Sequence, residues 1–302
     1  DVYRQFHRFF HVLKRRKILL LSGSPMKDGP EELASVMNLI LPSSDQLETD
    51  SSFLSAYFDG DNKIVNVDRL QKKLTGRISY LKTSSNPEVD MEFVGSLYGD
   101  LEYFRVSRTI MSDFQTESYE KAYEKDTRER SIYTNSRQVS LFVYPDGTYG
   151  QEGFSQRRYI YKQAGNAQMN RRARYVLGDE LVRALRPNSL EDVARYSCKY
   201  AFAIEEILDS EKTFVYLQYV NGSGSILFSK VLERFGYSQA FGNESFKSKR
   251  YALLTNQTST AKSIAKIIAR FNDPDNVDGE YISVIIGSRV VSEGFTLKDV
   301  RK

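Results

Sequence analysis

The residues best suited to chemistry in this chain are basic side chains that alternate with tyrosines between residues 156 and 175. The sequence there is QRRYIYKQAGNAQMNRRARY, and its cations are Arg157, Arg158, Lys162, Arg171, Arg172 and Arg174. Basic groups contact nucleic-acid phosphates and tyrosine rings stack on bases, so this stretch predicts a nucleic-acid contact. A solvated loop beside an insertion accounts for the same composition equally well. The formal charge of +4 does not decide between the two.

The nearest approach to a phosphate-binding loop is an isolated glycine pair, Gly222 and Gly224. The pattern Gly-x-x-x-x-Gly-Lys-Ser/Thr, whose backbone and lysine hold nucleotide phosphates, occurs nowhere in the chain. The pair also lacks the third glycine of a dinucleotide fingerprint. It therefore indicates a close turn between a strand and a helix rather than a cofactor site. We expect the chain not to hydrolyse ATP by itself.

Residues for metal or nucleophile chemistry are scarce. His7 and His11 lie four apart on an expected helix without the carboxylate of a metalloprotease motif, so we expect surface or partly buried histidines and no metal. They are the only histidines, which excludes a Ser-His-Asp set. The single cysteine, Cys198, excludes an internal disulfide and a cysteine-based zinc site, and favours a reducing, intracellular setting. No apolar run approaches the length of a membrane span.

The elements that would position these residues follow an α/β pattern at both ends of the chain. Near the start, apolar spacing predicts a helix at 3–16, a strand at 18–23 and a helix at 28–42. After residue 189 we expect a helix capped by Ser189, followed by alternating strands and helices. Their expected ranges are helix 189–208, strand 213–220, helix 226–237, helix 258–272 and strand 281–288. Ser292, Glu293 and Gly294 follow the last strand, at the carboxyl end where parallel sheets carry their functional loops.

Between about 45 and 190 the pattern changes to serine- and aspartate-rich loops with scattered elements. We expect strands at 77–82, 101–107 and 140–145 and a polar helix at 114–130. Because strands and helices do not alternate regularly here, this part is interpreted as an α+β insertion or accessory module.

Several blocks occur in an order that resembles a known family. LLLSGSPMKDGPEELASVMNLILP, FVYLQYVNGSGSILFSKVLERFGY and IIGSRVVSEGFTLKDVR resemble motifs III, IV and V of superfamily 2 helicases. The form of these motifs, and the segments GRISYLK, IMSDFQTESYEKAY and SRQVSLFVYPDGTYG between them, resemble the large DNA virus group. That group includes the poxvirus-type nucleoside triphosphate phosphohydrolase I and early transcription factor helicases.

The resemblance implies an α/β fold with RecA-like motor domains. Residues 1–45 would end the first, ATP-binding RecA-like domain, and 46–188 would form the α+β insertion. Residues 189–302 would be the second RecA-like domain, truncated before motif VI. In this arrangement the turn at 22–25 and the turn at 292–294 would face each other across a cleft.

The resemblance also implies site residues, none of them catalytic. Those that would couple nucleotide state to domain closure are Ser22, Gly23, Ser24, Glu293 and Gly294. Those that would contact nucleic acid are Asn221, Gly222, Ser223, Ser288 and Ser292, and the arginines of the basic stretch would add to them. Ser24 stands where many relatives have threonine.

The family's phosphate loop and Asp-Glu box would lie upstream of Asp1, and motif VI with its arginine finger beyond Lys302. ATP and Mg²⁺ would therefore belong to the complete parent protein, and this fragment alone would retain no cofactor and be inactive. The implied function is part of a nucleic-acid-dependent NTPase of a virus, linked to transcription. DNA or RNA is the expected track, and RNA polymerase or other transcription proteins are further partners. The expected location is intracellular, in host cytoplasm or virion.

Two other classes stay open. The chain could be a non-catalytic scaffold that binds nucleic acid or polymerase through its basic stretch. It could also be a two-domain Rossmann-like transferase that uses the Gly222–Gly224 turn for a nucleotide sugar.

Overall fold

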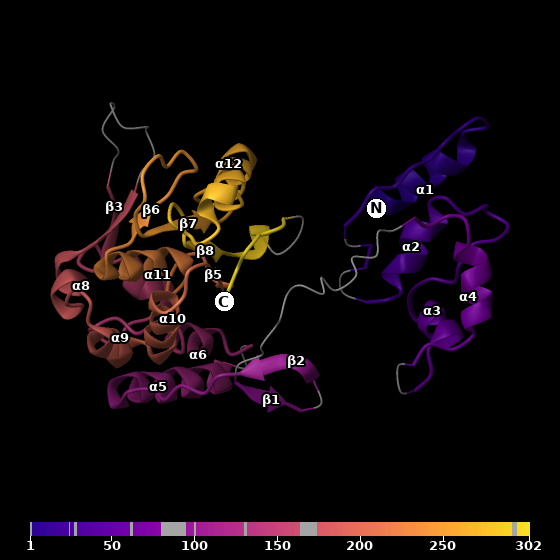
Figure 1. Ribbon diagram of the computed structural model, residues 1–302. Coiled ribbons are helices and arrows are strands. Elements are labelled where there is room, and N and C mark those ends of the chain that lie inside the picture. The colour runs from indigo at the N-terminus through magenta and orange to yellow at the C-terminus, as the bar shows by residue number, and fades with distance from the viewer. Residues whose placement is uncertain are drawn as a thin grey trace. The chain divides into compact units, whose positions relative to one another are not determined.

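The computed structural model describes residues 2–23, 25–26, 29–60, 63–79, 95–99, 101–129, 132–163, 174–291 and 295–302. The chain forms two compact units, Asp1–Glu92 and Phe93–Lys302, and each is described by itself (Figure 1). Their boundary falls inside the segment predicted as one insertion, so the three-part division into 1–45, 46–188 and 189–302 stays a prediction.

The first unit is helical in its described residues. Its helices are α1 (Val2–Val12), α2 (Glu32–Asn38), α3 (Asp50–Tyr57) and α4 (Val67–Leu74). The segment from α2 to α4 forms a small core of seven buried apolar residues, to which α1 contributes none: Ala34, Met37, Leu41, Leu47, Phe53, Tyr57 and Leu70. The buried Asn38 amide supports this core, because its Nδ2 donates to the Leu47 carbonyl at 2.9 Å and its Oδ1 accepts from the Leu47 N–H at 2.8 Å.

The two histidines connect α1 to the rest of this unit. Their rings stack with centroids 4.2 Å apart, and both side chains are partly buried, as predicted. His11 Nε2 lies 2.9 Å from the Leu41 carbonyl oxygen, and His7 Nε2 lies 2.7 Å from Gln46 Nε2. Hydrogen bonding within the unit therefore accounts for both side chains.

The strand predicted at 18–23 is wrong for this structure. Residues 18–23 form no strand, and Leu19 and Leu21 are 81% and 86% exposed. A strand buried on both faces of a parallel sheet needs neighbouring strands. The described residues of this unit offer only the isolated bridge between Phe58 and Ile64. The strand predicted at 77–82 is not formed at 77–79, and its remaining residues lie outside the described part.

The second unit is built on a four-stranded parallel sheet, which confirms the predicted α/β fold with a RecA-like parallel sheet. Its strands are β5 (Thr213–Tyr216), β6 (Ser238–Gln239), β7 (Arg250–Leu254) and β8 (Val284–Gly287), in the order β5-β8-β7-β6. Side chains alternate between the two faces. Tyr251 and Leu253 join a large core on one side, and Ala252 and Leu254 join a smaller core on the other.

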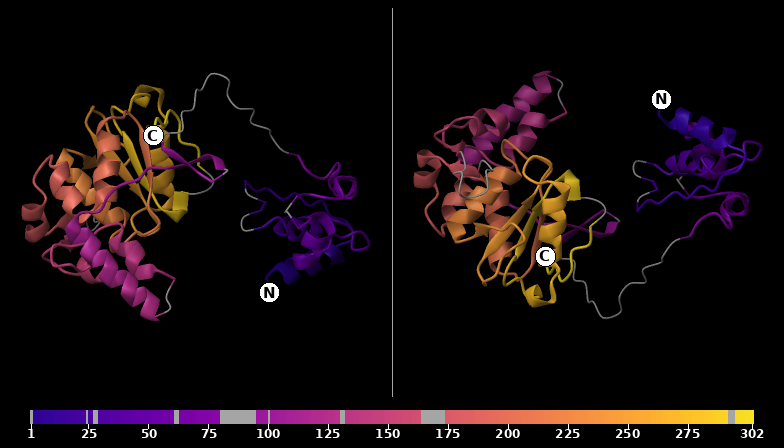
Figure 2. Two further views of the ribbon diagram at one scale, coloured as in Figure 1. Left: turned by 90° about the horizontal axis from the view of Figure 1, so that it is seen from below. Right: turned by 90° about the horizontal axis from the view of Figure 1, so that it is seen from above.

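Helices cover both faces of this sheet (Figure 1, Figure 2). α11 (Ser225–Leu232) packs in the larger core, and all eight of its residues are buried. α12 (Ala261–Phe271) packs in the smaller core and begins with a capping box between Thr260 and Ser263. Such two-sided cover suits the continuous apolar character of parallel strands.

The helix predicted at 189–208 is divided in two. α9 (Leu190–Tyr196) begins at the predicted Ser189 cap, whose side chain accepts from the Asp192 N–H, and α10 (Cys198–Leu208) follows. Ser197 separates them, because its backbone is extended and its Oγ accepts from the Tyr200 N–H at 2.9 Å while donating to the Leu141 carbonyl.

The same unit contains further elements outside this sheet. They are β1 (Ser96–Tyr98), β2 (Leu101–Val106), α5 (Asp113–Glu129), α6 (Thr134–Val139), α7 (Gly150–Phe154), β3 (Ile160–Gln163), β4 (Arg174–Leu177) and α8 (Asp179–Ala184). β2 and α5 confirm the elements predicted at 101–107 and 114–130. The strand predicted at 140–145 is reduced to an isolated antiparallel bridge between Val143 and Tyr149, and the Val143 N–H donates to the Tyr196 carbonyl at 3.0 Å.

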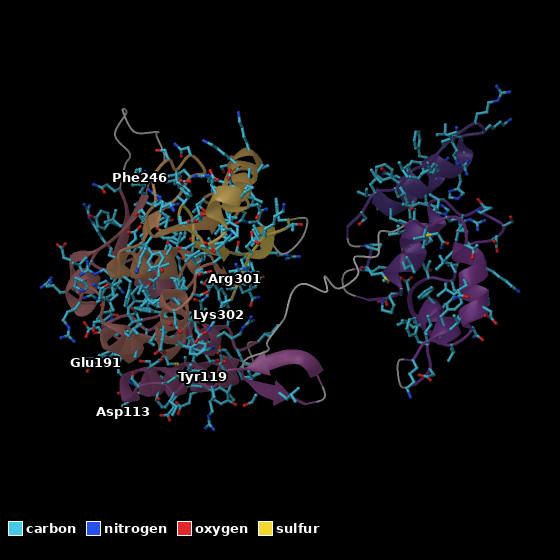
Figure 3. The ribbon with its side chains drawn as sticks, in the orientation of Figure 1. Asp113, Tyr119, Glu191, Phe246, Arg301 and Lys302 are labelled. Carbon is cyan, nitrogen blue, oxygen red and sulfur yellow. The ribbon has the colours of Figure 1, made fainter. Side chains whose placement is uncertain are left out.

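The last residues run along β5, on the side away from β8. The Arg301 N–H donates to the Lys212 carbonyl at 2.8 Å, and the Phe214 N–H donates to the Lys302 carbonyl at 2.7 Å. Figure 3 labels Arg301 and Lys302 in this position. No helix in the described part of the chain is long and apolar enough to cross a membrane.

Candidate nucleic-acid interface

The candidate interface lies at one edge of the sheet in the second unit. Because β5, β6, β7 and β8 are parallel, the segments after them emerge at the same edge. These segments are residues 217–224 after β5, 240–244 after β6, 255–260 after β7 and 288–291 after β8. We call this the carboxyl edge.

The turn at 221–224 is tightly closed. Gly222 has a φ of +67°, and a side chain there would meet the backbone of Gly150 at 2.9 Å. A side chain at Gly224 would lie 2.2 Å from the Tyr219 carbonyl oxygen. Both positions therefore require glycine, as the sequence interpretation of a close turn predicts.

The polar groups of this turn are bonded within the protein. The Ser223 N–H donates to Gln138 Oε1 at 3.1 Å, and Ser223 Oγ donates to the Phe142 carbonyl at 2.8 Å while accepting from the Gly150 N–H at 3.1 Å. The first N–H groups of α11, those of Ser225 and Ile226, donate to carbonyls of the preceding loop. No free row of N–H donors for a phosphate is found among these groups.

Two buried tyrosines hold the turn from the other side. Tyr144 Oη donates to the Gly222 carbonyl at 3.0 Å, and Tyr200 Oη lies 2.9 Å from the Ser223 carbonyl and 3.0 Å from that of Gly224. Burial raises the pKa of both phenols, which keeps them protonated as donors. We refer to Gln138, Tyr144, Gly150 and Tyr200 as the turn clamp.

The turn clamp restricts access to the nucleic-acid contacts that were predicted for this turn. Gly222 and Ser223 are buried, and their described polar groups are engaged, so a phosphate contact there would require the turn to open. Asn221 is partly buried, and its Oδ1 has no hydrogen-bond partner. The exposed lip of the loop is formed by Gln218 and the half-buried Tyr219.

The other predicted residues fall in three places. Ser288 directly follows β8 at the carboxyl edge and is 3% exposed. Ser22 and Gly23 are exposed in the first unit. The rest lie outside the described residues: Ser24, Arg171, Arg172, Ser292, Glu293 and Gly294. The structure thus brings Ser288 and residues 221–223 to one edge, and the cleft expected between 22–25 and 292–294 stays a prediction.

Sequence reasoning missed a polar turn after β7. Thr255 Oγ1 and Thr258 Oγ1 lie 2.8 Å apart, and Thr255 Oγ1 also accepts from the Thr258 N–H at 3.1 Å. This turn leaves Asn256 and Gln257 exposed at the carboxyl edge. The run TNQTST directly after the apolar strand RYALL could have identified it, because polar residues at the end of a buried parallel strand mark its functional end.

The described arginines of the basic stretch differ in how they are held. Arg158 pairs with Asp146 at 2.5 Å and Glu180 at 3.5 Å, so carboxylates offset its charge. The Arg157 guanidinium lies 5.2 Å from the Tyr161 ring, and that of Arg174 lies 5.2 Å from the Phe241 ring. Arg157 and Tyr161, with Lys162 and Tyr175, also line an open hollow between α7 and the β3–β4 hairpin.

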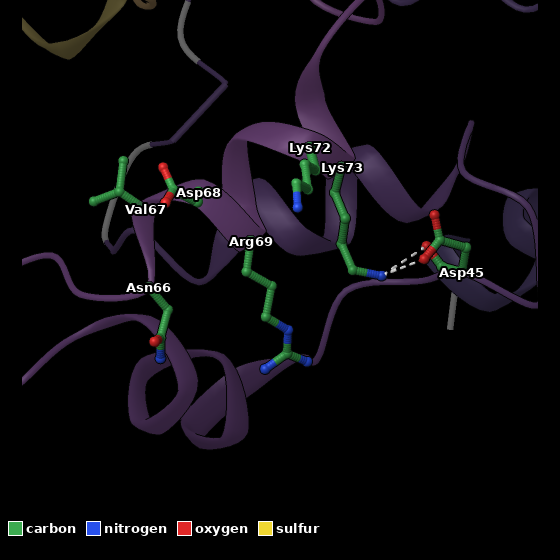
Figure 4. A pocket seen from close by; sticks show the side chains of 7 residues that line it. All are labelled: Asp45, Asn66, Val67, Asp68, Arg69, Lys72 and Lys73. Atoms are coloured by element: carbon green, nitrogen blue, oxygen red, sulfur yellow. Dashed lines mark hydrogen bonds and ion pairs between the residues drawn. The ribbon is translucent and has the colours of Figure 1, made fainter.

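A second hollow lies in the first unit (Figure 4). Among its lining residues are Asp45, Arg69, Lys72 and Lys73, but Lys73 pairs with Asp45 at 2.6 Å and Arg69 pairs with Glu48. Local carboxylates therefore offset two of its cations, and none of the predicted site residues lines it.

Comparison with known proteins finds relatives over the whole chain. Putative helicase 087L of Invertebrate iridescent virus 3 is 38% identical over 100% of this chain, and Putative helicase 009L of Frog virus 3 is 37% identical over 100%. The Early transcription factor 70 kDa subunit of Vaccinia virus is 25% identical over 94%. The chain spans only 28%, 29% and 43% of these proteins, respectively. No protein-family model matches the chain.

Proposed function

Because this chain is homologous to one segment of viral proteins named as helicases and of a viral early transcription factor subunit, we propose that it is part of a nucleic-acid-dependent NTPase linked to viral transcription. In this proposal the second unit is the second RecA-like motor domain, and its carboxyl edge holds one strand of DNA or RNA. The observation that carries the proposal is the convergence of four loops at that edge, of which those after β5 and β7 present exposed amide side chains.

The chemistry of the edge suits a nucleic-acid backbone. Asn256, Gln257 and Gln218 present exposed amide groups, which bind phosphate and sugar oxygens without reading sequence. Arg174 adds positive charge from the start of β4, and Arg157 adds more from the segment before β3, where Tyr161 could stack on a base. Ser288 and Asn221 would contact the strand after a small opening of their loops.

The residues present do not fit a nucleoside triphosphate. The glycine turn at 221–224 is bonded internally and lacks a lysine that could reach the phosphates. ATP and Mg²⁺ would therefore be bound by other parts of a complete NTPase, and no step of ATP hydrolysis is assigned to this chain. Ser22, Gly23 and Ser24, with Glu293 and Gly294, remain proposed positions for coupling the nucleotide to domain closure.

The test is nucleic-acid-stimulated ATPase activity of the natural full-length protein, measured with single-stranded and double-stranded DNA and RNA. We expect stimulation by at least one nucleic acid, and we expect Asn256→Ala with Gln257→Ala to weaken it. The 302-residue chain alone should bind the same nucleic acid without hydrolysing ATP. ATPase activity that ignores every nucleic acid would contradict the proposal.

A non-catalytic scaffold is the second candidate, and the basic β3–β4 hairpin is the observation that favours it. The scaffold would bind RNA polymerase or nucleic acid but would show no ATPase activity in the full-length protein. A phosphate loop and an Asp-Glu box in the same gene would exclude it.

A further inference from the structure

Arg137 occupies one end of the carboxyl edge although it is not among the site residues predicted from the sequence. It lies on α6, where the neighbouring Gln138 bonds the turn that leads into α11. Its guanidinium donates to Gln218 Oε1 and lies 5.6 Å from the Tyr219 ring. Both partners belong to the loop after β5, so Arg137 is placed at the exposed lip of that loop.

Arg174 occupies the opposite end of the same edge. It begins β4 and lies over Phe241, which follows β6. β4 then runs towards α8, and the Leu185 carbonyl after α8 accepts from Arg234 at 2.9 Å. Arg234 follows the C-terminal end of α11, which lies at the amino edge of the sheet because α11 begins at the carboxyl edge. The end of α8 is therefore near the amino edge, whereas the contact with Phe241 places Arg174 beside the segment that follows β6.

Both arginines keep their charge available. Each is exposed, and no ion pair to either is found among the described residues. Their observed partners are the faces of aromatic rings and, for Arg137, a neutral amide. These contacts hold the guanidinium in place without offsetting its charge. The side chain therefore loses less conformational entropy when it binds a phosphate. Arg158, with its two carboxylate neighbours, is the contrast.

The geometry points to a phosphate track that crosses the four strands of the sheet from Arg137 to Arg174, with both end contacts supplied by residues outside the parallel sheet. This inference rests on the proposed function and adds to it the direction of the bound strand. Three strand spacings of about 4.8 Å give a span of roughly 14 Å, close to the length of about four stacked nucleotides. Asn256 and Gln257 of the loop after β7 lie within this span.

The experiment measures binding of the 302-residue chain to fluorescein-labelled single-stranded 20-mers of DNA and RNA by anisotropy across a range of salt concentrations. Each phosphate contact to a single strand adds about 0.7 to the slope of log K against log salt. Arg137→Gln and Arg174→Gln should each lower the slope by about 0.7 and weaken binding about fivefold at 0.1 M salt. The double variant should lower the slope by about 1.4.

Arg183→Gln is the matched control. Arg183 is exposed on α8, near the amino edge, and its described contact is to the Asp179 carbonyl one turn earlier. It should leave both slope and affinity unchanged, and Arg137→Lys should retain most of the slope because it keeps the charge. Circular dichroism melts would confirm that all variants are folded.

The outcomes distinguish failure of the phosphate track from failure of the proposed function. Binding by the native chain with slopes unchanged in both glutamine variants would overturn the track and leave the proposed function standing. Loss in Arg183→Gln equal to that in the other variants would also overturn it, since the effect would then be one of net charge. No binding of either 20-mer by the native chain would overturn the track and the nucleic-acid part of the proposed function together.

Discussion

The turns at 22–25 and 221–224 both contain a Gly-Ser pair, and the residues that precede them have very different surroundings in the structure. The first follows an apolar run in which Leu19 and Leu21 are exposed, with no strand beside it among the described residues. The second follows a strand in a four-stranded sheet and is held by the turn clamp. The glycines allow the turn at 221–224 to close, and the neighbouring strand and the turn clamp hold it in place.

The largest test of this difference replaces one glycine in each turn. Gly224→Ala should cost about 3 kcal/mol or more of unfolding free energy, because its side chain would meet the Tyr219 carbonyl at 2.2 Å. Gly23→Ala should stay within about 0.5 kcal/mol, since a side chain at Gly23 meets nothing within 4 Å. Urea unfolding of both variants measures the two losses of unfolding free energy. Equal losses would contradict the predicted difference between the turns.

The turn clamp itself gives the next effect. Tyr144→Phe should lower the free energy of unfolding by about 1–2 kcal/mol, because the buried Gly222 carbonyl loses its donor. Tyr123→Phe, at a 45% exposed position on α5, serves as the control and should be nearly neutral. If the two variants lose the same stability, the hydrogen bond to the turn is not what holds it.

Acid should lower the free energy of unfolding of the second unit by about 1 kcal/mol through the protonation of Asp192. Hydrogen bonds and charge from Arg186 lower the pKa of Asp192, on α9, to about 2. Because the folded pKa is below the unfolded one, this contribution is present above about pH 4 and is lost as pH falls towards 2.

Asp192→Asn should remove this contribution at neutral pH and flatten the pH dependence. Unfolding measured between pH 7 and pH 2.5 reports it. A variant with the native pH profile would show that Asp192 is not the group responsible.

The smallest expected effect lies in the first unit. Leu19→Ser with Leu21→Ser should change the unfolding free energy by less than about 0.5 kcal/mol, because both side chains are exposed. A cost of several kcal/mol would mean that these leucines are buried in a sheet and that the two turns are alike after all.

Sequence periodicity was sufficient for two of the four strands of the sheet domain, β5 and β8, and for the helices α11 and α12, whereas β6 and β7 were not predicted. The strands near 213 and 284 and the helices near 226 and 261 have apolar patterns that only a sheet covered on both faces satisfies. The break at Ser197, the reduction of the strand predicted at 140–145 to an isolated bridge and the burial of Ser223 depend on hydrogen bonds between distant segments, such as that from Ser197 to Leu141. Local patterns contain no information on such partners.

Only part of the candidate site was predicted, because local patterns do not show contacts between distant segments. Ser288 and the 221–224 turn were located because they follow predicted strands, whereas Arg137 reaches the edge only through the packing of α6 against a loop 80 residues later in the sequence. Thr255 was missed although its position at a strand end was accessible to the same reasoning.

The complete burial of α11 means that residues 189–302 depend on the segment before them. Its eight residues have no side towards water, and the larger core around them includes Phe142, Tyr144, Phe154, Tyr159 and Leu181, all contributed by the segment before residue 189. If residues 189–302 were expressed alone, apolar side chains of that helix would be exposed to water. The segment before residue 189 is therefore needed to cover the helix, and only another apolar surface of similar shape could replace it.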